Sequence, residues 1–228
     1  MSNSASQSPP IASPEAPEVE ILKSEFSSHV AISAANMVVG ILDNQGGAFF
    51  GPRIDSESGE EIDGIKLATL FVSDEMNASL AKTNRVPAKD QLVSLGEAYK
   101  SAHILGAEQE TRDRVMQRRQ AKLDNIAQLK SLAETHASIR NLVVGAALLQ
   151  VMKPGSKLPP QDREHEYEME ELSLSGIGQC IVGGGGRQHT LTPGDVVRQT
   201  SGSSCDFKNI GRADRASLII VYSQPALQ

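Results

Sequence analysis

The last third of the chain alternates short β-type segments with turns that contain glycine or proline, and this pattern restricts the fold more than any other feature. A nearly continuous apolar run over residues 142–152 ends at Pro154-Gly155. The further strand-sized segments are 168–174, 178–182, 189–191, 196–199 and 217–222, and they are separated by Gly176, residues 183–186, Pro193-Gly194, Gly202 and Gly211. Many short strands with such turns are typical of a β-sandwich or β-barrel.

The order of these turns also resembles the two sequence motifs of the cupin family. The residues similar to the first motif are Gly155, Gln161, Arg163-Glu164-His165 and Gly176. Those at the spacings of the second motif are Gly194, Gly202, Cys205 and Asn209. The resemblance covers roughly residues 142–223 and implies a small jelly-roll barrel, which we expect over residues 141–228.

The resemblance also implies where a metal would bind, because cupins use two His, one Glu and a third His as ligands. Counting back from Gly176, and placing the last ligand by the second motif, aligns four residues with these positions: Arg163, His165, Met169 and Cys205. Counting forward from Gly155 would instead put Gln161 and Arg163 in the two His positions. On the first count, which we prefer, only His165 keeps the ligand type of the family.

Strand alternation separates these side chains by face. With a period of two, His165 and Met169 share one face, and Glu168 and Glu170 lie on the other. If His165 points into the barrel, the glutamates point out to solvent, unless a β-bulge turns Glu168 or Glu170 inward. The candidate ligand-binding residues are therefore Arg163, His165, Met169 and Cys205, and the alternative metal ligands are His165, Cys205, Glu168 and Glu170.

Several chemical interpretations of this set stay open beside plain packing. His165, Met169 and Cys205 are soft ligands that suit Cu(I) or Zn. Arg163, His165 and Cys205 would instead bind or act on a small anionic molecule, with Cys205 as a thiolate nucleophile. The outward glutamates would dock a basic partner, although exposed charges usually need no such explanation.

The chain before the barrel divides into three expected regions. Residues 1–20 are rich in Ser and Pro, which predicts a flexible or extended arm. Residues 21–72 are predicted to be strand-rich, because 30–42 and 65–72 contain β-type runs. Residues 73–140 are predicted to be helical, with an amphipathic stripe that includes Met116, Leu123, Ile126, Leu129 and Leu132. This stripe would pack against the β-domain or pair with another subunit.

Other polar residues carry weaker signals. Three histidines have no partner that the sequence identifies: His29, His103 and His136. The glycine run before Arg187 indicates a hairpin turn, since a phosphate-binding loop would be followed by a helix. We expect His189 in the core or at the rim of the barrel.

Composition excludes several classes of function. The 228 residues include 22 Lys and Arg against 28 Asp and Glu, so a formal net charge of −6 disfavours nucleic-acid partners. No apolar run approaches the ~20 residues of a membrane span, and no signal peptide is recognisable at the N-terminus. Two cysteines make no disulfide framework and suit a reducing compartment, so we expect a cytoplasmic protein.

These observations predict an α+β, mainly β chain with a C-terminal cupin-like barrel. The loss of most family ligands favours a non-enzymatic structural or interaction module without a cofactor, in a homo-oligomer or larger particle such as a decorated virion. The alternative is a cupin-type enzyme or sensor for a small anionic molecule, with one divalent metal or Cu(I). In that case His165, Cys205 and Glu168 or Glu170 would hold the metal and Arg163 would clamp the substrate.

Overall fold

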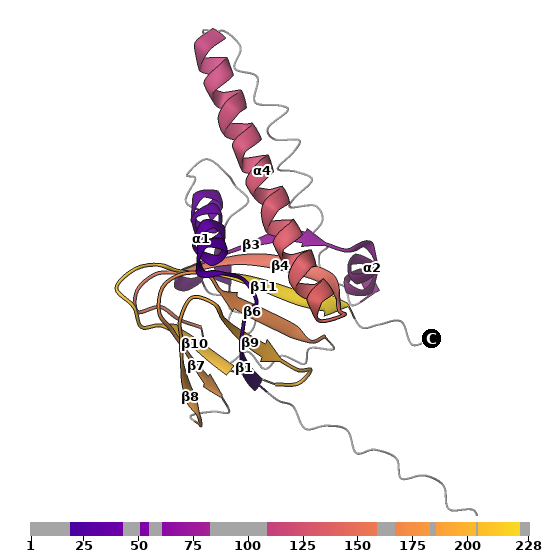
Figure 1. Ribbon diagram of the computed structural model, residues 1–228, viewed down its shortest axis with the longest axis vertical. Coiled ribbons are helices and arrows are strands. Elements are labelled where there is room, and N and C mark those ends of the chain that lie inside the picture. The colour runs from indigo at the N-terminus through magenta and orange to yellow at the C-terminus, as the bar shows by residue number, and fades with distance from the viewer. Residues whose placement is uncertain are drawn as a thin grey trace, which may run out of the picture.

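The chain folds into two antiparallel β-sheets that face each other, with helices on the outer side of the larger sheet (Figure 1). The computed structural model describes residues 19–42, 51–54, 61–82, 109–158, 167–182, 186–203 and 205–223. In spatial order the larger sheet consists of β1 (Val19–Lys23), β9 (Asp195–Gln199), β6 (Met169–Ser173), β11 (Arg215–Ser223), β4 (Val143–Met152), β3 (Glu61–Val72) and β2 (Gly51–Ile54). The smaller sheet consists of β5 (Lys157–Leu158), β10 (Cys205–Asn209), β7 (Gly178–Val182) and β8 (Gln188–Leu191).

The helices are α1 (Ser28–Leu42), α2 (Asp74–Lys82) and α4 (Gln109–Ile139), and α1 and α4 pack on β3, β4 and β11. Strand alternation divides the core into two layers. Leu149, Leu172 and Leu218 face the helices, together with the buried apolar residues of α1 and the C-terminal half of α4. Met152 and Val197 face the smaller sheet and help to fill the barrel. The central strands β6, β11 and β4 of the larger sheet are thus buried on both faces.

The predicted fold class is confirmed, and the strands predicted over 142–152, 168–174, 178–182, 189–191, 196–199 and 217–222 match β4, β6, β7, β8, β9 and β11. Strand β10, which contains Cys205, was not among the predicted segments. Helices α2 and α4 confirm helical structure within residues 73–140. Among the helices that the structure describes, none combines the length and the apolar character that crossing a membrane requires.

The strand prediction for residues 30–42 is wrong, because this segment forms α1. Its buried residues recur at helical spacing, and they are Ala31, Ala34, Ala35, Val38, Ile41 and Leu42. The β-branched residues that suggested strands include Val30 and Ile32, which are 40% and 55% exposed. Residues 65–72 do form a strand, within β3. Tertiary packing of one helical face outweighs the local β preference.

The N-terminal segment also joins the sheet that the C-terminal strands build. Residues 1–18 of the predicted arm lie outside the described residues, whereas Val19 and Glu20 begin β1. Strand β1 pairs with β9, so that Ile21 lies beside Val197. Residues far apart in the sequence therefore meet at one edge of the barrel, and this edge positions the site described next.

Candidate functional site

Only two of the four aligned ligand positions fall within the described residues, since Arg163 and His165 lie outside them. Met169 is the first residue of β6 and Cys205 the first of β10, and both are buried. Met169 pairs with Gln199, which pairs with Val19, whereas Cys205 pairs with Val182. Val19 and Val182 line one pocket, so Met169 and Cys205 lie at the same end of the barrel, on opposite sheets.

Glu168 and Glu170 lie on the face opposite Met169, as strand alternation predicts, but they are not a solvated row. Glu170 is fully buried between β6 and α4, and Glu168 forms an ion pair with Arg198. Strand β6 keeps a continuous register with β9 and β11, so no bulge turns Glu170 into the barrel. The expectation of solvent-facing glutamates is wrong because helix α4 covers this face of the sheet.

Glu170 is the centre of a buried polar cluster. His136 Nε2 lies 2.6 Å from Glu170 Oε2, and the Tyr222 hydroxyl donates a hydrogen bond of 2.8 Å to the same oxygen. The Arg140 guanidinium lies 3.2 Å from Glu170 Oε1. His136, which the sequence left without a partner, is only 1% exposed. Its spacing from the buried Leu129 is the signal that would have placed it on the core-facing side of α4.

Electrostatics in this cluster favour the ionised carboxylate. Burial raises the pKa of Glu170, but hydrogen bonds from His136 and Tyr222 and the charge of Arg140 outweigh burial, and the pKa lies below its ordinary value. Burial and the neighbouring charge of Glu170 raise the pKa of Tyr222. None of these residues lines the described pocket. The cluster therefore fastens α4 to the sheet rather than exposing an acid or base to a substrate.

A second buried ion pair fills the end of the barrel away from the pocket. Arg215 Nη1 lies 2.6 Å from Glu171 Oε1, and Nη2 donates a hydrogen bond of 2.9 Å to Ser173. A Cβ atom on Gly178 would lie 2.5 Å from Arg215 Nε, so the close approach of this side chain requires glycine. The sequence analysis did not identify Glu171 and Arg215 as site residues. Strand alternation does place Glu171 on the same face of β6 as Met169.

The described donor atoms do not fit the metal site of the family. Within the described part of the chain, no group of three or more His, Cys, Asp or Glu side chains is arranged to hold a metal ion. Met169 and Cys205 are soft sulfur donors, and Glu170 is engaged with α4. A metal held by His165, Cys205 and a glutamate, whether divalent or Cu(I), stays a prediction.

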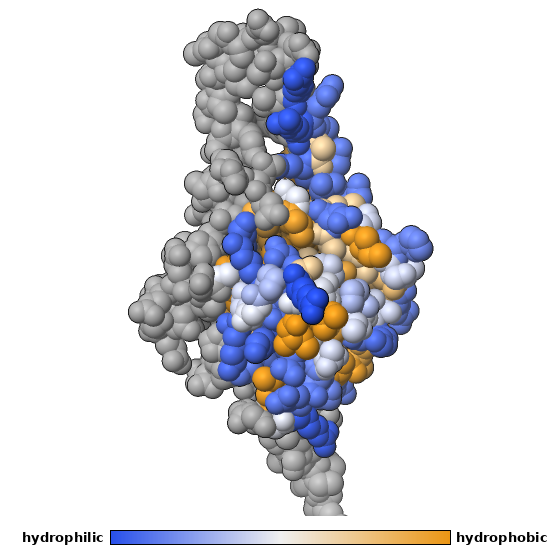
Figure 2. Space-filling model, turned by 90° about the vertical axis from the view of Figure 1, so that its left-hand side faces the viewer, coloured by the Kyte–Doolittle hydropathy of each residue, from blue (hydrophilic) through white to orange (hydrophobic). Residues whose placement is uncertain are grey.

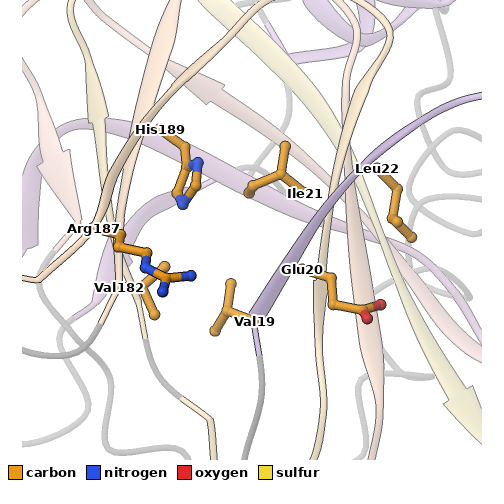
Figure 3. A pocket seen from close by; sticks show the side chains of 7 residues that line it. All are labelled: Val19, Glu20, Ile21, Leu22, Val182, Arg187 and His189. Carbon is orange, nitrogen blue, oxygen red and sulfur yellow. The ribbon is translucent and has the colours of Figure 1, made fainter.

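The pocket has a volume of about 720 Å³ and lies between the edge strands of the two sheets (Figure 3). It is lined by Val19, Glu20, Ile21, Leu22, Val182, Arg187 and His189. Figure 3 shows Ile21 and His189 directed toward one another, with Val19, Val182 and Arg187 grouped beside them, whereas Glu20 and Leu22 lie on the other side of β1. His189 is thus a rim residue. Strand β8 follows Arg187, so the absence of a phosphate-loop helix at this position is confirmed.

Comparison with protein-family models found no match, and comparison with curated proteins found none either. Solved structures that are similar to the chain include a sugar phosphate isomerase of the cupin superfamily from Silicibacter pomeroyi. It is 21% identical with a TM-score of 0.31, and the match covers 35% of this chain and 51% of that chain. A cupin domain from Schizosaccharomyces pombe is 22% identical with a TM-score of 0.31, over 34% of this chain and 56% of that one.

A predicted oxalate decarboxylase from Thermotoga maritima is 24% identical with a TM-score of 0.31, and the match covers 38% of this chain and 72% of that chain. The matches thus span about half of the first two relatives. Two of these structures are described as cupins. At these identities and TM-scores the likeness says nothing about activity.

Proposed function

We propose that this protein is a non-enzymatic interaction module that self-associates through the N-terminal half of α4. The observation that carries the proposal is the position of this helix. Its 31 residues correspond to about 46 Å at ~1.5 Å per residue. Among the residues of α4 whose burial is described, the buried ones begin at Leu129. The N-terminal half projects away from the sheets (Figure 1), and Figure 2 shows its visible surface as mostly hydrophilic.

The projecting half has apolar side chains that a partner would cover. Met116 and Leu123 are 57% and 47% exposed. They are seven residues apart, which places them on the same side of the helix after nearly two turns. A helical segment of this length is marginally stable in water without tertiary contacts. Packing of Met116 and Leu123 against a second copy would supply both the missing contacts and the stability of the segment.

Charge favours a second copy of this chain as the partner. Residues 112–122 contain five Lys and Arg but only one Asp, whereas the other 217 residues contain 17 Lys and Arg and 27 Asp and Glu. The projecting half is therefore basic and the rest of the molecule acidic. Attraction between the basic half of one copy and the acidic body of another would favour association and would weaken with salt.

The experiment is a measurement of molecular mass by light scattering, on the full chain and on two variants. We expect the wild-type chain to exceed its monomer mass of 24.4 kDa at low salt. The double variant Met116→Glu with Leu123→Glu should return it to 24.4 kDa. The double variant Ala121→Glu with Gln128→Glu is the matched control, because both residues are exposed on the opposite side of α4 and the pair adds the same two negative charges. A wild-type monomer at every salt concentration, or equal masses for all three proteins, would contradict the proposal.

The other predicted functions stay predictions. A role in a larger particle, such as a decorated virion, requires partners beyond a second copy. An enzyme or sensor built on Arg163, His165 and Cys205 depends on residues of which two lie outside the described part of the chain. The sulfur atoms of Met169 and Cys205 do not by themselves favour a catalytic role over a role in core packing.

A further inference from the structure

The pocket at the edge of the barrel is separate from α4, because none of the lining residues that the structure describes belongs to that helix. It lies between β1, the edge strand of the larger sheet, and β8, the edge strand of the smaller one. Its volume of about 720 Å³ falls within the ~300–1,000 Å³ that is usual for small-molecule sites. The opening between the two edges is therefore large enough for an organic molecule.

The lining of this pocket combines apolar side chains with charged and polar ones. Val19, Ile21 and Val182 form the apolar part, and Arg187 and His189 provide a guanidinium and an imidazole on the same side (Figure 3). Apolar side chains beside a few polar groups that fix orientation are usual in small-molecule sites. The guanidinium fork matches a carboxylate in charge and geometry.

The charge of Arg187 is available to a ligand. Three other basic residues of the barrel are in ion pairs, which are Lys23–Asp195, Arg198–Glu168 and Lys157–Asp206. Among the described residues, no carboxylate forms an ion pair with Arg187, which is exposed at the pocket. Glu20, the acidic residue of the lining, lies on the other side of β1 and is 3.8 Å from Arg198. The charged group on the pocket side of β1 is therefore the Arg187 guanidinium.

We propose that this pocket binds a small organic anion. Its apolar body would pack on Val19, Ile21 and Val182, and its anionic group would accept hydrogen bonds from Arg187. His189 would contact the same end of the ligand from the neighbouring strand. These three apolar side chains favour a carboxylate with a hydrocarbon chain or ring over a fully polar anion such as inorganic phosphate, because burial of apolar surface contributes to binding. The site differs in its residues from the set that the cupin resemblance implied.

The test is calorimetric titration of the full chain with octanoate, compared with octan-1-ol and inorganic phosphate. We expect saturable binding of one octanoate per chain and weaker binding of the other two probes. Arg187→Gln should weaken octanoate binding about tenfold or more, since a charge-assisted hydrogen bond is lost. Arg212→Gln removes the same charge from an exposed position that does not line the pocket, and it should bind octanoate like the wild type.

Two further measurements keep this test decisive. Circular dichroism establishes that each variant is folded, and Ile21→Ser, which removes apolar wall without touching the charge, should also weaken octanoate binding. Equal octanoate affinity in wild type and Arg187→Gln, or octan-1-ol binding as tightly as octanoate, would overturn the proposal. The Met116→Glu and Leu123→Glu variant should bind octanoate normally, so failure of self-association and failure of this site give different results.

Discussion

Glu170 and Glu171 are neighbours in β6, yet their carboxylates lie in different layers of the protein. Glu170 faces α4 and contacts His136 and Arg140, whereas Glu171 faces the barrel interior and pairs with Arg215. The alternation of a strand explains the opposite directions. Each buried carboxylate has its own arginine, and removing one partner of such a pair leaves an uncompensated charge that costs about 3–5 kcal/mol. These two residues therefore hold β6 in position between the helix layer and the barrel interior.

The Glu170 cluster predicts a pH dependence of folding stability. The pKa of Glu170 in the folded chain lies below its ordinary value of 4.5, so its ionised form stabilises the fold above that pH. This stabilisation is lost as the pH falls below 4.5 toward the folded pKa. Glu170→Gln should lower the free energy of unfolding by about 1.5–3 kcal/mol at neutral pH, through loss of charge-assisted hydrogen bonds.

The measurement is urea unfolding of wild type and Glu170→Gln across the acid range. The difference in the free energy of unfolding should shrink as the pH falls, because the wild-type carboxylate becomes protonated. His136, Arg140 and Tyr222 face this carboxylate and are kept in both proteins. Glu134→Gln is the control, since Glu134 is an exposed residue of α4. A difference that does not change with pH would show that Glu170 acts through packing alone.

A single methyl group added at Gly178 should disturb the packing of the barrel interior. A Cβ at Gly178 would lie 2.5 Å from Arg215 Nε, so Gly178→Ala should displace Arg215 from Glu171. We expect a loss of about 1–3 kcal/mol in the free energy of unfolding, the usual cost of overpacking. Gly40→Ala is the matched control, because a Cβ there has no neighbour within 4 Å and Gly40 lies within α1. That change should stabilise the chain by about 0.5–1 kcal/mol; equal effects of the two substitutions would refute the packing argument.

At the level of elements, local signals predicted the C-terminal strands well. Glycine and proline limit where a strand can end, and Gly176 and Gly194 both adopt a positive φ that favours glycine. In residues 30–42 the glycine, Gly40, lies inside the helix and does not mark its end, and the β-branched residues form a short run that a strand and a buried helix share. The segment becomes α1 because its alanines pack on the larger sheet. That sheet is built mostly from residues more than a hundred positions later in the sequence.

The candidate site could be predicted only in part, for a similar reason. Alternation correctly separates Met169 from Glu170, because a strand period is a local property. Whether the second face meets solvent depends on α4, which covers Glu170 from outside the barrel. The pocket depends on the meeting of β1 and β8, which are more than 160 residues apart. No spacing within one motif could have brought Ile21 and His189 together.

At the scale of the whole molecule, the barrel is not a self-contained C-terminal unit. Strands β1, β2 and β3 come from the first third of the chain and extend the sheet formed by β9, β6, β11 and β4. The helix-facing core combines Val38 of α1 and Leu129 of α4 with Leu149, Leu172 and Leu218 of the C-terminal strands. The predicted division at residues 20, 72 and 140 therefore separates parts that share one hydrophobic core.

This shared core predicts that residues 141–228 do not fold alone. The fragment would expose the face that α1 and α4 cover, including Leu149 and Leu218, and would leave the charge of Glu170 without His136. Lost burial of each large apolar side chain costs about 1.5–3 kcal/mol, which a marginally stable domain cannot tolerate several times over. Thermal unfolding should give one cooperative transition for the full chain and none for the fragment. A cooperative transition and a dispersed NMR spectrum from the fragment would contradict this prediction. The C-terminal strands would then form an independent domain that is stable without α1 and α4.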